Sequence, residues 1–316
     1  RTSYTYEPSI FLKWKMSRVR NMDISFAYNT SVPDFISTLG YRDTTDPLSV
    51  STGNPLLHKS HSHTTTYNYH RMWLRKQIVL GLNVSYNKDI NPIATLYRYN
   101  STTGAYESKP MNVKGGDMWK FGVNYDQGIG VYFRLMNKFK VLTSKSYGFL
   151  TIVDNNDPNA VPDLNLQKRL GIDENMELSY EAEKVQLTLF NDLQWNRYRY
   201  DDDTYNSSPL YNSLGISATL KLSPFEMYIR LSDDFRKGYA TSEMNGHKLM
   251  SMASISYGFC KNKCRLSLFV DDIFNNDIWY DNNYSAFQRT ETTTNYMHHY
   301  ANLKFSYRFD AKAKKK

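Results

Sequence analysis

The sequence predicts an all-β chain, folded as an antiparallel, meandering transmembrane β-barrel of which this is the C-terminal portion. Three observations lead to this fold class. They are short segments that alternate apolar and polar residues, connections that alternate between short and long, and strands of about 10–14 residues, close to the length that spans a membrane. We expect residues 1–309 to form the barrel and residues 310–316 to form a charged periplasmic tail.

Alternation with a period of two recurs along the whole chain, and no helical period is sustained. Since successive side chains of a strand point to opposite sides, each alternating segment has one apolar and one polar face. The clearest segments are Met22–Tyr28, Ile78–Tyr86, Trp119–Tyr125, Leu214–Leu220 and Ala301–Phe309. The apolar face could pack on a second sheet in a sandwich, or meet lipid in a barrel whose polar face lines the lumen.

The connections favour the barrel, because short periplasmic turns and long extracellular loops are typical of outer-membrane barrels. The expected short turns are residues 18–21, 75–76, 126–128, 183–184, 223–224 and 261–263. The expected long loops are residues 29–62, 88–114, 143–163, 201–211, 236–246 and 275–294. We expect the loop at 88–114 to contain its own hairpin, with its turn at residues 100–104.

We count about thirteen strands, bounded by turn residues. The last ends at Phe309 on the periplasmic side. Because bacterial single-chain barrels have an even number of strands, the odd count implies at least one strand before Arg1.

Composition and charge exclude several classes of protein. No run of 18 apolar residues is present, so a transmembrane helix is not expected, and the first residues do not form a signal peptide. Aromatic residues make up 15% of the chain, which suits the two interfacial belts of a membrane barrel. The net charge is +8, but the basic residues are scattered, and we expect no nucleic-acid partner.

Three places resemble the TonB-dependent receptor-like barrels of Bacteroidetes. The first is Pro8–Trp14 followed by Met22–Tyr28, which is similar to a hairpin of that family. The second is Asp46-Pro47 followed by Gly53-Asn54-Pro55-Leu56-Leu57, similar to a "GNPxL" loop. Lys59 and Ser60 depart from the Pro-Glu pair that often follows it. The third comprises Val270–Asn275 and Leu303–Phe309, which resemble its closing strands.

The resemblance implies a 22-stranded barrel, located in the bacterial outer membrane and surrounded by its lipids and lipopolysaccharide. It also implies uptake of a metal chelate, glycan or peptide, driven by the inner-membrane TonB complex acting on an upstream plug. The alternative is a non-transporting barrel that serves as a structural or assembly partner of a surface lipoprotein. A passive porin is a third, weaker interpretation. No cofactor and no enzymatic activity are expected.

Several polar clusters are candidate sites. His58, His61 and His63 could contribute to a metal site, although no nearby acid or cysteine completes one, and a polar loop is the favoured interpretation. Asp201–Asp203 are interpreted as a solvated turn rather than a calcium site. Asp233, Asp234 and His247 could form an acid–histidine pair, but no oriented nucleophile accompanies them.

Cys260 and Cys264 flank a predicted periplasmic turn, and we expect them to lie across a hairpin, within reach of a disulfide in an oxidising compartment. At the end of the chain, Phe305, Tyr307 and Phe309 alternate on the outer face. They resemble the signal that is read by the barrel-assembly machinery.

The alternation also assigns individual residues to the two faces. The predicted lipid-facing residues are Ile24, Phe26, Leu80, Leu82, Val123, Leu187, Ile216, Leu303 and Phe305. The predicted lumen-facing charges are Lys120, Lys221, Glu226, Arg230, Lys304 and Arg308.

Overall fold

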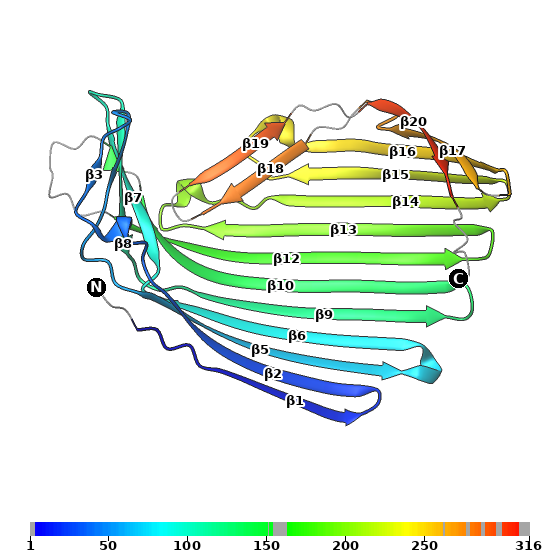
Figure 1. Cartoon of the computed structure of the whole chain (residues 1–316), viewed down its shortest axis with the longest axis horizontal. Coiled ribbons are helices and arrows are strands. Elements are labelled where there is room, and N and C mark those ends of the chain that lie inside the picture. The colour runs from blue at the N-terminus through cyan, green and yellow to red at the C-terminus, as the bar shows by residue number, and fades with distance from the viewer. Residues whose placement is uncertain are drawn as a thin grey trace, which may run out of the picture.

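A curved sheet of thirteen antiparallel strands dominates the computed structural model of this chain (Figure 1). The structure describes residues 4–150, 152–153, 163–261, 263–275, 279–285, 288–294 and 299–309. The sheet is open: β1 and β20 are its two edges. The predicted all-β meander and the count of about thirteen strands are therefore confirmed.

The thirteen strands pair in chain order, each with the next strand of the sheet. They are β1 (Ser9–Ser17), β2 (Arg20–Ser31), β5 (Ser60–Trp73), β6 (Ile78–Ile90), β9 (Asp117–Ile129), β10 (Phe133–Phe149), β12 (Leu164–Glu181), β13 (Val185–Arg199), β14 (Leu210–Leu222), β15 (Phe225–Lys237), β16 (Gly246–Phe259), β17 (Cys264–Asp271) and β20 (Tyr300–Tyr307). The helical segments are single 3₁₀ turns, namely η1 (Ile36–Thr38), η2 (Leu74–Lys76), η3 (Asp203–Tyr205) and η4 (Ser242–Met244). Within the described residues, no helix is long and apolar enough to cross a membrane.

Short turns gather at one end of the sheet and long loops at the other, as predicted (Figure 1). One predicted turn was wrong. Residues 126–128 do not turn but continue β9, because Asp126 pairs with Arg134 on the neighbouring strand and extends the ladder. The chain reverses at Gly130 instead, whose φ of +67° is a conformation that glycine adopts without strain. β10 also runs to Phe149, into the predicted loop at 143–163.

A separate five-stranded sheet stands at the long-loop end, at the left of Figure 1. Its strands, in spatial order, are β11 (Ile152–Val153), β7 (Ile93–Asn100), β8 (Ala105–Asn112), β4 (Ser49–Thr52) and β3 (Arg42–Asp43). β7 and β8 are the hairpin predicted inside the loop at 88–114. The side-chain amide of Asn54, in the "GNPxL" segment, donates a hydrogen bond to the carbonyl of Pro110 (2.9 Å) and so ties the two loops together.

Strand register shows that the nine predicted lipid-facing residues share one face of the main sheet. Directly paired residues lie on the same face, and pairs such as Leu82–Val123 and Phe305–Leu266 connect the apolar positions from strand to strand. Ile216 and Leu303 are 43% and 68% exposed, so no second sheet packs over them. The sandwich interpretation is thereby excluded, and the membrane-facing interpretation is supported.

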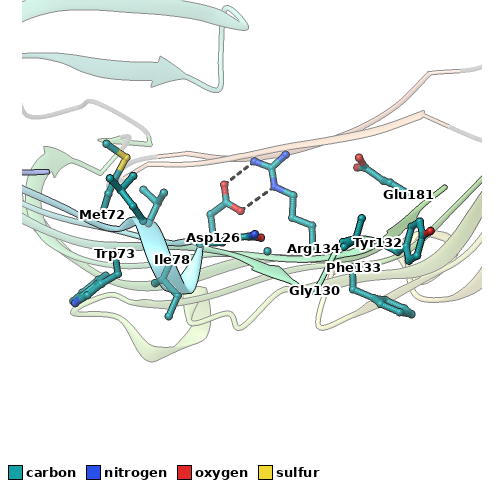
Figure 2. A pocket seen from close by; sticks show the side chains of 14 residues that line it. Met72, Trp73, Ile78, Asp126, Gly130, Tyr132, Phe133, Arg134 and Glu181 are labelled. Carbon is teal, nitrogen blue, oxygen red and sulfur yellow. Dashed lines mark hydrogen bonds and ion pairs between the residues drawn. The ribbon is translucent and has the colours of Figure 1, made fainter. Parts of the chain in front are cut away.

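The polar face is the concave one. Side chains converge on the inside of a curved sheet, and small polar residues of this face, Ser179, Ser213 and Ser232, are buried while the apolar side chains of the other face are exposed. Figure 2 shows the two faces directly, with Asp126, Arg134 and Glu181 on one side of the strands and Trp73 and Phe133 on the other. An apolar exterior around a polar interior is the arrangement of a membrane barrel.

Aromatic rings form two bands on the convex face. Near the long loops, rings from β2, β5, β6 and β9 follow one another through ring contacts of 4.4–6.3 Å. These are Phe26, His63, Tyr86, Trp119 and Phe121. Near the short turns the second band contains Phe133, Tyr180, Phe225, Tyr257, Phe259 and Tyr307. The bands match the interfacial girdles expected from the composition.

Candidate functional site

The concave face carries groups of polar side chains that bond across strands. Near β2, the amide of Asn68 donates to Asp23 (2.7 Å) and the amide of Asn83 donates to Asn68 (2.5 Å). Farther round, the amide of Asn175 donates to Asp192. Because these groups satisfy one another, the polar face is ordered and hydrophilic, which suits a water-filled passage.

The predicted lumen-facing charges lie on this polar face. Arg230 stacks over the ring of Phe190, with its guanidinium carbon 3.8 Å from the ring centroid. Gly215 allows this arrangement, because a Cβ there would meet the Phe190 ring at 2.3 Å. Glu226 accepts a hydrogen bond from Arg265 (3.1 Å). Charges of both signs therefore face the interior.

Two pockets occupy the short-turn end. The first, of about 450 Å³, lies between the turns of β5–β6 and β9–β10 and includes Asp126, Arg134 and Glu181 (Figure 2). The second, of about 870 Å³, is lined by residues of β14–β17 and β20 and is mainly basic. Lys184, Lys221, Lys263, Arg265 and Arg308 line it, against Glu183 and Glu226.

At the opposite end, part of the loop between β17 and β20 folds inward. Its hairpin, β18 (Trp279–Tyr284) and β19 (Arg289–Thr294), forms a separate two-stranded sheet. The ring of Tyr284 stacks on Tyr198 of the concave face, with centroids 4.5 Å apart. Tyr284 is 8% exposed and Tyr198 is 5% exposed. The hairpin thus covers the concave face at the mouth of the lumen.

Glu291 of β19 fastens the hairpin to the loop between β15 and β16. Its carboxylate accepts hydrogen bonds from the backbone N–H of Ala240 (3.1 Å) and of Thr241 (2.9 Å). Within the hairpin, Tyr284 (2.9 Å) and Arg289 (2.7 Å) also donate to it. Burial alone would raise the pKa of Glu291, but these donors, Arg289 first, outweigh it and lower the pKa to about 2.

Tyr280 makes the second attachment. Lys248 of β16 donates to the Tyr280 hydroxyl (2.6 Å), which in turn donates to the carbonyl of Glu243 (2.8 Å). The guanidinium of Arg236 lies between the rings of Tyr211 and Tyr280, 5.1 and 5.0 Å from their centroids. On the hairpin's side these contacts are made by side chains and not by strand pairing, so the hairpin can separate without breaking the main sheet.

The sequence did not identify this docked hairpin. Its local signal was present, since Thr290 and Thr292–Thr294 are β-branched residues that favour a strand. Its partners, Tyr198 and Ala240, are far away in the chain, and no periodicity reports such contacts.

The three candidate metal ligands are not brought together. His61 and His63 lie on the convex face: His61 stacks on Tyr28 (5.5 Å), and His63 belongs to the aromatic band. His58 precedes β5, and its backbone N–H donates to Asn112. Among the described residues, no three His, Cys, Asp or Glu side chains form a group that could hold a metal ion.

The predicted acidic clusters bond to nearby protein groups: Asp201 accepts a hydrogen bond from the backbone N–H of Leu166 in β12 (3.1 Å). Asp202 accepts hydrogen bonds from the backbone and hydroxyl of Thr204, and Asp203 accepts one from Asn206. Asp233 and His247 form the predicted acid–histidine pair (2.7 Å), but both are exposed on the convex face, away from the lumen. The exposed position suits a hydrogen-bonded pair at the membrane interface rather than catalysis.

The two cysteines were predicted to face each other across a hairpin, and this register was wrong. Phe259 stands opposite Cys264, while Cys260 occupies the turn with a φ of +53°. The thiols are free in the structure, although their side chains hydrogen-bond. The disulfide stays a prediction. Alkylation of fresh membranes without reductant, followed by mass measurement, tests it: two labelled thiols would exclude the bridge.

The proposed assembly signal lies at the edge strand. Phe305 and Tyr307 are on the convex face, and Tyr307 contacts Phe309 edge-on at 4.4 Å. Its role in assembly stays a prediction. The tail at 310–316 lies outside the described residues.

Comparison with known proteins agrees with this geometry. Residues 3–307 match the model of the outer membrane protein beta-barrel family, and the chain belongs to that family. No curated protein matches. A solved structure of the copper transporter OprC has a similar fold, with a TM-score of 0.50 and 8% identity over 84% of this chain. The chain spans about 44% of that protein's length.

The family and the fold define a multi-pass β-barrel protein of the outer membrane.

Proposed function

We propose that this chain forms part of the wall of an outer-membrane transporter that imports a scarce nutrient, with its mouth gated by the hairpin β18–β19. The observation that carries the proposal is the inward docking of that hairpin on the concave face, through Tyr284, Glu291 and Tyr280. A passive pore needs an open mouth, whereas a docked cover must move before a solute passes. Gated entry is therefore favoured over free diffusion.

The energy source and the substrate class are further parts of the proposal. The resemblance of the "GNPxL" loop and of the closing strands to TonB-dependent receptor-like barrels supports energised import, pulled from the inner membrane through a plug. The nutrient would be a metal chelate, a glycan or a peptide. The ordered polar layer on the concave face suits a hydrophilic solute of this kind.

A test of this proposal compares a deletion strain with the same strain complemented by the full-length gene. Both are fed one mixture of iron chelates, oligosaccharides and short peptides, and depletion of each compound is followed by mass spectrometry. We expect one class to disappear from the medium only in the complemented strain, and only without a protonophore. Depletion that persists with the protonophore would indicate a passive pore. No difference between the strains would contradict transport altogether.

A second candidate is a scaffold that binds a surface lipoprotein. It is favoured by an apolar loop patch around β3 and β4, defined by Phe35, Ile36, Tyr41, Leu48 and Leu56, which are 58–79% exposed. Exposed apolar side chains gathered on a loop region often mark protein contacts. Replacing Phe35 and Leu56 with serine, followed by crosslinking in intact cells, would separate the roles. Loss of a crosslinked lipoprotein with unchanged uptake would indicate that the patch serves only the scaffold role.

A further inference from the structure

Four cations gather on the convex, apolar face near the long-loop end. Lys145 of β10 is paired directly with Lys168 of β12, and Lys168 is paired directly with Arg199 of β13. Arg197 lies one step below Arg199 on the same face, opposite Leu170. All four side chains are exposed. We name these four residues the outer basic cluster.

The pairing of these residues is unfavourable without an external anion. Like charges directly opposite each other in an antiparallel sheet destabilise it. In the part of the chain that the structure describes, no member of the outer basic cluster has a salt-bridge partner. Asp117 faces Lys145 across the ladder without forming an ion pair, and Asp201, two residues after Arg199, accepts a hydrogen bond from the backbone N–H of Leu166. Four positive charges thus point outward with little compensation from the protein.

The height of the cluster follows from the order of side chains along β10. Its convex face begins at Phe133 in the lower aromatic band and continues through Leu135 and Phe139 to Val141. The twelve steps from Phe133 to Lys145 cover roughly 41 Å along the strand, or roughly 31 Å in height at a strand tilt of about 40°, which exceeds an apolar band about 25 Å tall. Lys145 comes two convex positions after Val141. The strand then reaches Phe149, which packs with Leu96 and Val113 of the five-stranded sheet.

The cluster therefore lies between the apolar band and the sheet that stands outside it. The neighbouring strands agree, since Tyr86 and Trp119 of the upper aromatic band are level with Thr143, just below Lys145. In outer-membrane barrels the long loops are extracellular. The cluster thus lies at the depth of the headgroups of the outer leaflet.

We propose that Lys145, Lys168, Arg197 and Arg199 form a binding site for the phosphate groups of an outer-leaflet lipid. Guanidinium groups bind phosphate oxygens in a bidentate manner, while lysines act as point charges. Basic side chains at the membrane surface attract anionic lipids. The apolar side chains below, Val141, Ile172 and Trp195, would contact the acyl chains of the same lipid. The site is on the outside of the barrel and does not depend on the proposed transport.

The test uses the full-length protein in a neutral detergent. Native mass spectrometry measures binding of purified bisphosphorylated lipid A and of the same lipid after enzymatic dephosphorylation. We expect the phosphorylated form to bind more tightly, and the double substitution Lys145→Gln with Lys168→Gln to weaken it about tenfold or more. Binding of the dephosphorylated form should be unaffected by the substitutions.

A matched control removes two charges from the other face of the same strand, with Lys138→Gln and Lys140→Gln. These residues are paired with Asn175 and Asp173 on the concave face, so we expect them to leave lipid binding unchanged. Equal weakening by both double variants would show an effect of net charge and overturn the site. So would equal binding of the two lipids, or no weakening by the Lys145 and Lys168 pair. Full displacement by millimolar inorganic phosphate would assign the site to free phosphate instead of lipid.

Discussion

The two structured regions at the long-loop end are attached in different ways. The five-stranded sheet is built from backbone pairing among five segments, and its Leu96 shares an apolar core with Val113 and with Phe149 at the end of β10 in the wall. The hairpin β18–β19 pairs only with itself and is fastened by side chains, chiefly Tyr280, Tyr284 and Glu291. The five-stranded sheet is therefore a fixed projection, whereas the hairpin β18–β19 can detach and reattach without disturbing the wall.

Removing the last residues of strand β20 should have the largest effect, because neither the five-stranded sheet nor the hairpin can be positioned unless the barrel wall inserts into the membrane. Truncation from Tyr307 onward removes Tyr307 and Phe309, and we expect outer-membrane insertion to be abolished. Removal of residues 310–316 alone should be tolerated, because that segment is charged and its loss leaves the aromatic positions intact. Fractionation of cells and heat-modifiability on gels measure insertion. Equal defects in the two truncations would contradict the assembly role.

The next largest effect is expected from a substitution in the apolar core of the five-stranded sheet. Leu96 is 2% exposed, and Leu96→Ala should destabilise the five-stranded sheet by about 2–5 kcal/mol. Hydrogen–deuterium exchange should then increase in β7 and β8 and stay unchanged in β18–β19. Increased exchange in the hairpin as well would show that the five-stranded sheet and the hairpin are coupled and are not attached independently.

The assignment of the lipid-facing and lumen-facing sides of the wall is tested by Leu82→Arg. Asn83→Arg is the matched control on the opposite face. Leu82 faces outward in the middle of the apolar band, where an arginine should cost about 2–4 kcal/mol. Asn83 faces the polar lumen, where the same change should cost less. Folding titrations in lipid vesicles measure both. A larger loss from Asn83→Arg would reverse the assignment of the two faces.

The hairpin should respond to pH only under strongly acidic conditions. The pKa of Glu291 is lowered from an ordinary 4.5 to about 2, partly by Arg289 and Tyr284 of the hairpin itself and partly by the N–H groups of Thr241 and Ala240 on the wall. The part of the stabilisation that comes from docking is therefore complete above pH 4.5 and is lost as the pH falls towards 2. Hydrogen–deuterium exchange of β18–β19 should therefore stay slow at pH 4. Release of the hairpin at pH 5 would mean that Glu291 does not fasten it.

The sequence was sufficient to predict the strands and the two faces of the barrel wall. It was insufficient to predict the hairpin that covers the mouth of the lumen. Alternation fixes which face of a strand is buried, and a slip by one residue would expose Leu82 to the lumen, so strands and faces follow directly from the pattern. Turn positions were less secure, because Asp126 resembles a turn residue but bonds to Arg134 within the ladder. The hairpin was missed because Glu291 and Tyr284 find partners that are distant in the sequence.

A detachable hairpin over the mouth of the lumen should control access to position 198. Labelling of Tyr198→Cys in intact cells measures this access directly. Cys260 and Cys264 are replaced with serine, and a membrane-impermeant maleimide reports access to position 198. A buried hydrogen bond to a charged group contributes about 1.5–3 kcal/mol, so Glu291→Ala should accelerate labelling roughly tenfold or more. Tyr198→Cys removes the ring contact with Tyr284 from both backgrounds, so the comparison isolates Glu291. We expect slow labelling with Glu291 intact and fast labelling without it; equal rates would show that Glu291 does not hold the hairpin over the lumen.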